Sequence, residues 1–165
     1  MKVQGVTIEN YGSYHGRHVV KLRDQGLVLV LGDNRDEPRM SSNGAAKSSI
    51  FEALDWCLFG VVPKGDHVDS VINDESSAVT VEASFRDEDQ DRTLTVRRSK
   101  QRGKAAELKY ALDATDCTTL DTRETQRALE AELGLDRDVF HAAVFYAQSD
   151  RLGFAESTEA RRMEL

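Results

Sequence analysis

The stretch that decides the fold reads LVLVL over residues 27–31, SNGAAKSS over residues 42–49 and IFEALDWCLF over residues 50–59. The first part is a continuous apolar run, which predicts a strand buried on both faces of a sheet. The third part has apolar residues at helical spacing and is followed by Gly60, so we expect a helix over residues 47–59. Its apolar stripe consists of Ile50, Phe51, Leu54 and Leu58. A turn rich in Ser and Gly between such a strand and such a helix is typical of a phosphate-binding loop.

The chemistry of this turn resides in its last residues. Lys47 supplies an ammonium group for the outer phosphates of a nucleotide, and Ser48 supplies a hydroxyl for Mg²⁺. In the pattern G-x-x-x-x-G-K-[ST], however, Ser41 and Ala46 occupy the two glycine positions. A left-handed alanine costs ~1–2 kcal/mol, so we expect binding to be weakened roughly 5- to 30-fold rather than abolished. The alternative from these residues alone is a turn that caps an ordinary helix.

Length and composition indicate one globular unit. The chain has 165 residues, of which 39% are hydrophobic, enough for one domain or a piece of a larger one. The net charge of −7 excludes a uniformly basic nucleic-acid coat but not a local basic patch. Cys57 and Cys117 lie too far apart for a CxxC metal or redox site, and no membrane span or signal peptide is recognisable. We expect a soluble protein in a reducing compartment.

Alternating apolar residues elsewhere predict strands and hairpins. The expected strands are residues 2–8, 18–22, 78–85, 92–98, 107–112 and, as a short apolar run, 143–147. A helix over residues 123–133 is expected, capped by Asp121 or Thr122 and closed by Gly134. Residues 33–42 are polar and predict a loop.

The order of these stretches resembles the N-terminal lobe of an SbcC-type, SMC-like DNA-repair ATPase, with features of phage recombination ATPases. The stretches that carry the resemblance are VTIENYGSY (6–14), LVLVLGDN (27–34), SNGAAKSSIFEALDWCLFG (42–60), TVRRSK (95–100), VFYAQSD (144–150) and FAESTEARRMEL (154–165). The resemblance implies an α/β P-loop NTPase fold of the ABC-ATPase head type. A mixed sheet would surround the P-loop helix, next to an antiparallel hairpin subdomain. Residues 1–165 would form a single lobe, with a coiled-coil helix beginning over residues 153–165.

The resemblance also implies a site for ATP and Mg²⁺. The residues around the triphosphate would be Asn43, Gly44, Ala45, Ala46, Lys47, Ser48 and Ser49. Lys47 would hold the β- and γ-phosphates, while Ser48 and Gln148 would complete the Mg²⁺ shell. Gln148 would also lie near the attacking water, so Lys47 and Gln148 are the expected catalytic residues. A neutral amide suits both tasks, since its oxygen binds a hard cation and its NH₂ orients water. The alternative for Gln148 is a plain polar residue after a strand.

By the same resemblance, ATP would join two heads as a homodimer that regulates an SbcD-type nuclease acting on DNA ends. The other expected partners are DNA and a C-terminal lobe with the signature loop and Walker B residues, motifs that residues 1–165 do not contain. We therefore expect little or no hydrolysis by this chain alone, because phosphoryl transfer needs several elements at once. Residues 36–42 resemble an insertion. The implied location is the cytoplasm, in association with the nucleoid.

A basic segment over residues 92–104 offers a candidate DNA contact. Its proposed DNA-binding residues are Arg97, Arg98, Lys100, Arg102 and Lys104. Each neutralised phosphate would add about 0.9 to the salt slope of binding. The alternative is a solvated hairpin that balances the acidic turn over residues 87–91. Two other functions remain open: a DNA- or protein-binding module with a degenerate loop that does not need nucleotide, and a self-sufficient phosphotransferase.

Overall fold

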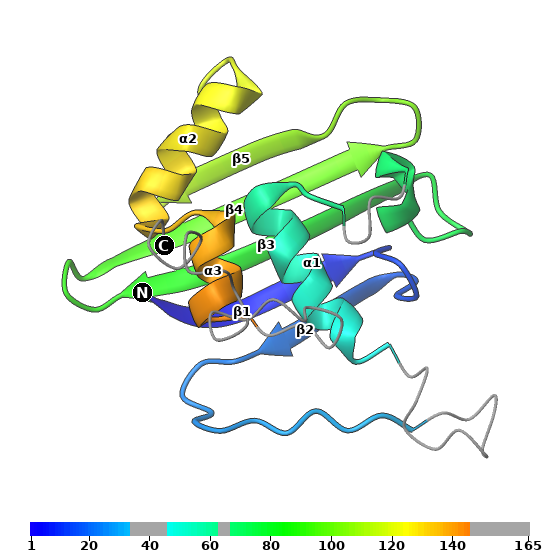
Figure 1. Ribbon diagram of the computed structural model, residues 1–165, viewed down its shortest axis with the longest axis horizontal. Coiled ribbons are helices and arrows are strands. Elements are labelled where there is room, and N and C mark those ends of the chain that lie inside the picture. The colour runs from blue at the N-terminus through cyan, green and yellow to red at the C-terminus, as the bar shows by residue number, and fades with distance from the viewer. Residues whose placement is uncertain (34–45, 63–66, 146–165) are drawn as a thin grey trace, which may run out of the picture. The chain divides into compact units, whose positions relative to one another are not determined.

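The computed structural model describes residues 1–33, 46–62 and 67–145 (Figure 1). Contacts divide the chain into two units, Met1–Gln126 and Arg127–Leu165. The first unit holds a six-stranded sheet in the order β2-β1-β3-β4-β5-β6, and all of these pairings are antiparallel. The strands are β1 (Lys2–Glu9), β2 (Arg17–Lys21), β3 (Ala78–Asp87), β4 (Arg92–Gln101), β5 (Glu107–Leu112) and β6 (Thr115–Asp116).

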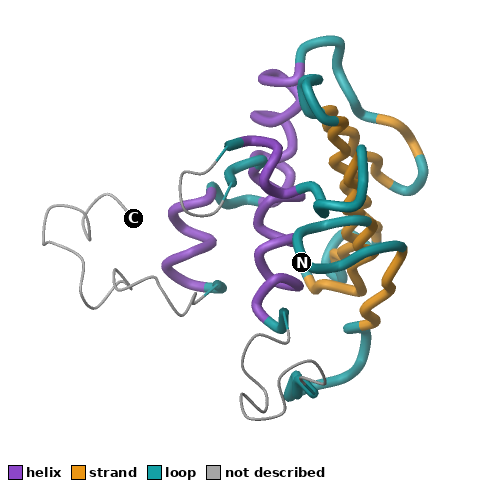
Figure 2. The backbone as a smooth tube through the Cα atoms, turned by 90° about the vertical axis from the view of Figure 1, so that its right-hand side faces the viewer, coloured by secondary structure: helices purple, strands orange, loops and turns teal. Residues whose placement is uncertain are grey.

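Helix α1 (Ser48–Phe59) lies across the sheet and contacts β1, β3 and β4. The edge-on view in Figure 2 shows it against one face. The 3-10 helix η3 (Val68–Val71) follows in the same unit. Helix α2 (Thr122–Leu133) begins in the first unit and ends in the second, which also contains α3 (Arg137–Ala143). No helix in the described part of the chain is both long and apolar enough to cross a membrane.

The core lies between α1 and the sheet. Alternate residues of β3 and β4 are buried because successive side chains of a strand point to opposite faces. These inward residues include Val79, Val81, Ala83, Phe85, Leu94 and Val96. Trp56 of α1 is buried above them, and its ring lies 5.9 Å from that of Tyr11. Burial also raises the pKa of the Cys57 thiol to about 12, so this cysteine stays protonated inside the core.

Most of the predicted elements are confirmed, with small changes at their ends. The five strands outside the two apolar runs form as predicted, and the hairpin of residues 78–85 and 92–98 extends to β3 and β4. Asp121 caps α2 by accepting hydrogen bonds from the backbone N–H groups of Arg123 and Glu124 at 2.6 and 3.2 Å. Gly60 and Gly134 close α1 and α2 with φ of 70° in each case. Local signals thus located these helices correctly.

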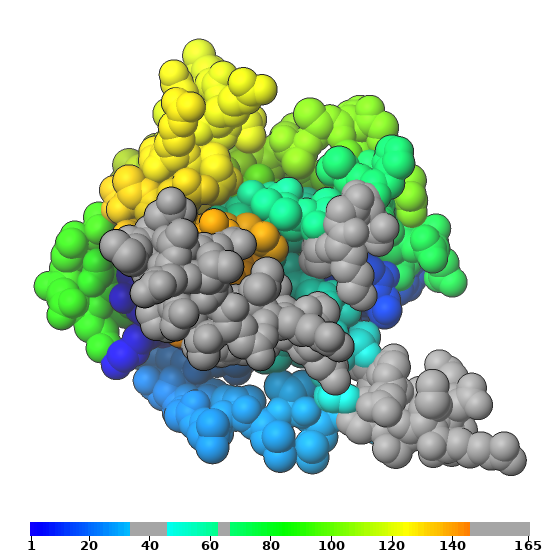
Figure 3. Space-filling model, viewed as in Figure 1, coloured from blue at the N-terminus to red at the C-terminus, as the bar shows by residue number. Residues whose placement is uncertain are grey.

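The predicted buried strand over residues 27–31 is wrong. Leu27, Leu29 and Leu31 are 101%, 80% and 78% exposed, and the segment forms no strand. Figure 3 shows the light blue atoms of residues 22–33 at the surface. An apolar run becomes a doubly buried strand only when neighbouring strands and covering helices are supplied. Among the described residues, none pairs with this segment as a strand.

The predicted strand over residues 143–147 is also wrong where it is described. Ala143 is the last residue of α3, and Val144 and Phe145 form no strand. The helix prevails because the Asp136 side chain accepts a hydrogen bond from Val139 N at 2.8 Å and so caps it. The loop predicted over residues 33–42 and the coiled-coil helix predicted over residues 153–165 lie outside the described residues, apart from Asp33.

The apolar stripe predicted for α1 needs one correction. Phe51 is 41% exposed, whereas Leu54 and Leu58 are buried as predicted. The buried face instead includes Ala53, Trp56 and Cys57. The last two turns of the helix, rather than its first turn, pack against the sheet.

Candidate functional site

The start of α1 brings together the described half of the predicted phosphate site. Lys47 occupies the N-cap position with helical φ and ψ, and Ser48 is the first residue of the helix. Ser49 N donates a hydrogen bond to Ala46 O at 3.2 Å. The Lys47 side chain forms no capping hydrogen bond, and the first turn of the helix carries no acidic residue. Helix N-terminal amides with a partial positive charge attract anions, so this end suits phosphate.

Ala46 has the backbone conformation that the sequence pattern requires of a glycine. Its φ is +54°, in the left-handed region. This conformation destabilises an alanine by ~1–2 kcal/mol, and Ala46 lies immediately before Lys47. The carbonyl of Ala46 accepts a second hydrogen bond, from the Tyr14 hydroxyl at 3.1 Å. The sequence offered no local signal for Tyr14, because this contact spans 32 residues.

The remaining predicted nucleotide residues are not described. Asn43, Gly44, Ala45 and Gln148 lie outside the described residues. The donor set that is described suits a nucleotide–Mg²⁺ complex, because an ammonium, a hydroxyl and helix N-terminal amides are the groups that such a complex uses. The roles of these residues stay predictions.

The opposite end of α1 is held by Arg98, a buried cation of β4. Its Nε donates to Cys57 O at 3.0 Å, and its guanidinium also donates to Leu58 O at 3.2 Å. A third bond, of 2.6 Å, reaches Gln126 Oε1, while Gln126 Nε2 donates to Leu58 O at 3.0 Å. A cation at a helix C-terminus is favourable because it compensates the helix dipole. Arg98 therefore anchors the helix that begins at the phosphate loop.

Gly60 leaves the space that this guanidinium fills. A Cβ built on Gly60 would lie 2.7 Å from Arg98 Nη1. With its positive φ, residue 60 is therefore suited to glycine on two grounds.

Two further basic residues hold the β4–β5 turn against η3 and the segment that follows it. Lys100 Nζ lies 2.8 Å from Asp69 Oδ1, and its side chain is only 5% exposed. The hydrogen bond from Lys100 lowers the pKa of Asp69. Arg102 Nε donates to Ser76 O at 3.0 Å, and its guanidinium donates to Asn73 O at 3.1 Å. These contacts fix local structure.

The predicted DNA contact is therefore wrong for Arg98 and Lys100. Both are buried because they follow Leu94 and Val96 on the inward face of β4. Arg102 is exposed, but its guanidinium bonds to backbone carbonyls. At the other end of the segment, Arg92 Nε lies 3.6 Å from Asp87 Oδ2, as the alternative of a hairpin balancing its acidic turn predicts.

Arg97 and Lys104 keep their candidate role, and Lys109 joins them. Arg97 points to the sheet face opposite α1 and pairs in register with Lys109 of β5. All three basic side chains are exposed. Arg97, Ser99, Glu107 and Lys109 line a shallow hollow of about 190 Å³. The sequence did not reveal Lys109, because strand register brings it beside Arg97.

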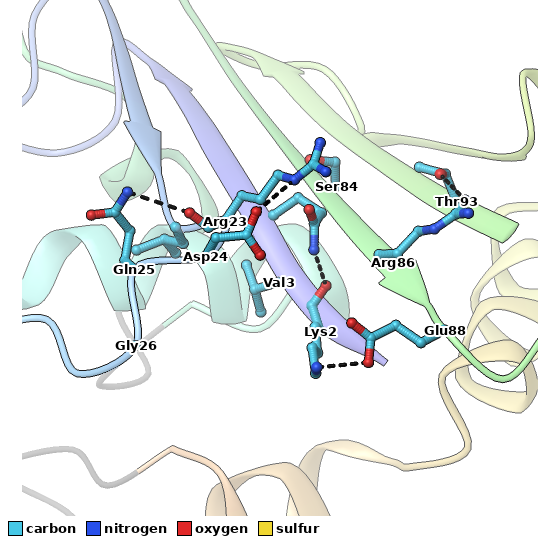
Figure 4. Close-up of a pocket in the computed structure, with 12 residues that line it drawn as sticks. Lys2, Val3, Arg23, Asp24, Gln25, Gly26, Ser84, Arg86, Glu88 and Thr93 are labelled. Atoms are coloured by element: carbon cyan, nitrogen blue, oxygen red, sulfur yellow. Dashed lines mark hydrogen bonds and ion pairs between the residues drawn. The ribbon is translucent and has the colours of Figure 1, made fainter. Parts of the chain in front are cut away.

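A separate cavity of about 780 Å³ opens beside the first residues of β1 (Figure 4). Four of its charged residues pair with one another, Lys2 with Glu88 at 2.6 Å and Arg23 with Asp24 at 3.0 Å, whereas Arg86 pairs with Asp91 outside the lining. The hydrogen bond with Glu88 raises the pKa of Lys2. The cavity contains no predicted site residue, and each of its charged residues is in an ion pair, which leaves little attraction for a charged ligand.

Comparison with known proteins identifies relatives of the whole chain. A sequence model of the AAA domain matches residues 6–164. The DNA double-strand break repair Rad50 ATPases of Methanococcus maripaludis and Methanocaldococcus jannaschii are 23% and 25% identical, over 100% and 99% of this chain. Arcadin-4 of Pyrobaculum calidifontis is 26% identical over 98%. The chain spans only 15–19% of the length of these curated relatives.

Solved structures agree on the fold. A structure from work on ATP-driven dimerisation and DNA-stimulated activation of SMC ATPases superposes with a TM-score of 0.71 at 18% identity, covering 100% of this chain and 97% of the other. An SMC head bound to the C-terminal winged-helix domain of ScpA gives 0.63 at 17% identity, covering 84% and 42%. The chain therefore belongs to the AAA-domain family, and its fold is that of the N-terminal lobe of an SMC- and Rad50-like ATPase head.

Proposed function

We propose that this chain is the ATP- and Mg²⁺-binding half of a DNA-repair ATPase head. The observation that carries the proposal is the left-handed Ala46, directly before Lys47 and Ser48 at the start of α1. An alanine adopts this conformation at a cost, and the phosphate-loop pattern places a glycine at this position. The match of the AAA-domain family to residues 6–164 supports the same function.

In this proposal each residue of the loop has a distinct task. Lys47 holds the outer phosphates, and Ser48 together with Gln148 binds Mg²⁺. The residues that surround the triphosphate are Asn43, Gly44, Ala45, Ala46, Lys47, Ser48 and Ser49. Bound Mg²⁺ would neutralise phosphate charge, and Gln148 would orient the attacking water. Lys47 and Gln148 are therefore the proposed catalytic residues.

The proposed partners follow from what the described part of the chain leaves exposed. The apolar side chains of Leu27, Leu29 and Leu31 face solvent, and exposed apolar surface of this kind favours burial against another element. We assign this cover to a C-terminal lobe that carries the signature loop and Walker B residues. A second head, an SbcD-type nuclease and DNA ends complete the proposed assembly, in the cytoplasm and near the nucleoid. The second head is supported by the ATP-driven dimerisation of the SMC ATPases, whose fold this chain shares.

Calorimetric titration with ATP–Mg²⁺ tests the nucleotide site. We expect the wild-type chain to bind and Lys47→Ala to lose at least tenfold in affinity, since a charge-assisted phosphate contact contributes about 1.5–3 kcal/mol. Lys21→Ala, which removes an exposed lysine from β2, is the matched control. Equal heats from wild type and Lys47→Ala would contradict the proposal. Little or no ATP hydrolysis is expected from this chain alone, because the second half of the head supplies the missing groups.

The second candidate function is DNA or protein binding that does not need nucleotide. The specific observation in its favour is the exposed pair Arg97 and Lys109, side by side on the open sheet face. A double variant, Arg97→Ala with Lys109→Ala, should reduce the salt slope of DNA binding by about 1.8 if both contact phosphates. DNA retention that ignores ATP and loses this slope would favour the second function. Retention that depends on ATP would favour the ATPase head.

A further inference from the structure

A side chain of the distant β1–β2 connection forms a hydrogen bond with the Ala46 carbonyl. The Tyr14 hydroxyl donates to Ala46 O at 3.1 Å, and the same oxygen accepts from Ser49 N at 3.2 Å. The orientation of this carbonyl depends on the backbone torsions of Ala46, whose φ is +54°. Two donors on one carbonyl therefore favour one backbone conformation at the residue before Lys47.

Tyr14 is itself held in place by its own loop. Asn10 N donates to Gly16 O at 3.0 Å, and Asn10 Oδ1 accepts from Gly16 N at 2.7 Å, so the loop is closed at its base. Tyr14 N donates to Tyr11 O at 2.8 Å. The Tyr14 ring meets the edge of the His18 ring at 5.1 Å. A donor whose position is fixed in this way loses little freedom when it forms a bond.

The same loop is anchored from a second side. Gly12 N donates to Val71 O at 2.9 Å, and Asn73 Nδ2 donates back to Gly12 O at 2.7 Å. Asn73 N also donates to Asn10 O at 2.9 Å. The connection that carries Tyr14 is thus tied to the segment around η3 as well as to its own strands. Its hydroxyl approaches Ala46 from a rigid support.

We propose that Tyr14 is a positioning residue that holds Ala46 in its left-handed conformation and so replaces the missing glycine of the phosphate loop. This inference rests on the proposed ATP site. Without supporting contacts, the left-handed conformation of an alanine is less populated by roughly 5- to 30-fold, the equivalent of ~1–2 kcal/mol. A hydrogen bond to the Ala46 carbonyl raises the population of the left-handed conformation by about 2- to 12-fold, the equivalent of about 0.5–1.5 kcal/mol. Tyr14 thereby offsets much of the penalty that the sequence pattern predicts.

Partial burial strengthens the case that the hydroxyl acts as a donor. Tyr14 is half-buried, and burial raises the pKa of its hydroxyl above the ordinary value for tyrosine. The group is therefore protonated throughout the physiological range and can always donate to Ala46 O. Phenylalanine at position 14 keeps the ring and its contact with His18 but removes the donor.

A cycle of two substitutions tests the inference. In the wild-type background, Tyr14→Phe should weaken ATP–Mg²⁺ binding by about 2- to 12-fold. In chains that carry Ala46→Gly, the same change should cost less than about 2-fold, because glycine adopts positive φ about as readily as negative φ. Tyr11→Phe is the matched control, since its hydroxyl has no hydrogen bond among the described residues. Equal losses from Tyr14→Phe in both backgrounds would overturn the inference.

A second measurement does not depend on nucleotide. NMR reports the sign of φ at Ala46 through the distance between its amide proton and Hα, which is shorter when φ is positive. Tyr14→Phe should reduce the population with positive φ, and Tyr11→Phe should not. An unchanged population would overturn the role of Tyr14 whether or not ATP binds. If the wild-type chain binds no ATP, the proposed function fails, and this measurement alone decides whether Tyr14 holds Ala46.

Discussion

Replacing Arg98 with methionine tests whether a buried arginine anchors the C-terminus of the phosphate-loop helix. Methionine retains much of the apolar volume of the arginine side chain but removes its charge and donors. The backbone carbonyls of Cys57 and Leu58 and the Gln126 amide oxygen would each lose a bond from the guanidinium. Leu58 O would keep its bond from Gln126 Nε2, so Cys57 O and Gln126 Oε1 bear most of the loss.

The magnitude follows from these contacts. A buried acceptor left without its partner costs about 1–3 kcal/mol, and loss of a cation from a helix C-terminus costs about 0.3–1 kcal/mol. With two acceptors affected, we therefore expect Arg98→Met to lower the free energy of unfolding by about 2–7 kcal/mol. A loss of this size is a large part of the ~5–15 kcal/mol by which a typical domain is stable.

Urea unfolding followed by circular dichroism measures the free energy of unfolding. The slope of that free energy against urea concentration should be the same in wild type and variant. The matched control is Arg97→Met, one residue earlier on the exposed face of the same strand. An exposed substitution of this kind should change stability by no more than about 0.5 kcal/mol. If Arg98→Met costs no more than Arg97→Met, the anchoring role assigned to the buried guanidinium is refuted.

Two further perturbations probe contacts around the same strand. Gly60→Ala should destabilise the chain more than Gly103→Ala in thermal melts, because both residues have positive φ but only at residue 60 does the new Cβ meet Arg98, at 2.7 Å; equal losses would contradict the predicted clash. The pKa of Asp69 is lowered by its hydrogen bond from Lys100, so its contribution to stability is complete above its unfolded pKa and is lost as the pH falls through the lower folded value. Stability measured from pH 5 downwards should therefore decline less steeply in Asp69→Asn than in wild type, and parallel curves would count against the Asp69–Lys100 contact.

Local patterns in the sequence were sufficient for the elements whose stabilising contacts are close in the chain. The alternation of residues 78–85 and 92–98 predicted the β3–β4 hairpin, because period-2 burial follows from strand geometry. Asp121 and Gly134 marked the ends of α2 for equally local reasons, a side-chain cap and a left-handed closing residue. The prediction that residue 46 needs a left-handed backbone also came from its place beside Lys47 and is confirmed.

The same alternation also separates the inward from the outward basic residues of the segment over residues 92–104, which charge alone does not. Arg98 and Lys100 continue the inward row begun by Leu94 and Val96, whereas Arg97 belongs to the outward row. Reading the segment as a uniform basic surface therefore assigned two buried cations to DNA. Period-2 alternation could have separated them, although it could not identify the α1 carbonyls that receive Arg98.

The sequence by itself determined where strands alternate, where helices begin and end, and which residue of the phosphate loop bears backbone strain. Only the tertiary structure decided that the leucines at 27, 29 and 31 remain exposed in this unit, that Lys109 lies beside Arg97 and that Tyr14 reaches Ala46. The physical reason is the range of the interactions involved. Caps, turns and alternation depend on residues within a few positions of one another, whereas burial, register and long-range hydrogen bonds depend on which segments the folded chain brings together.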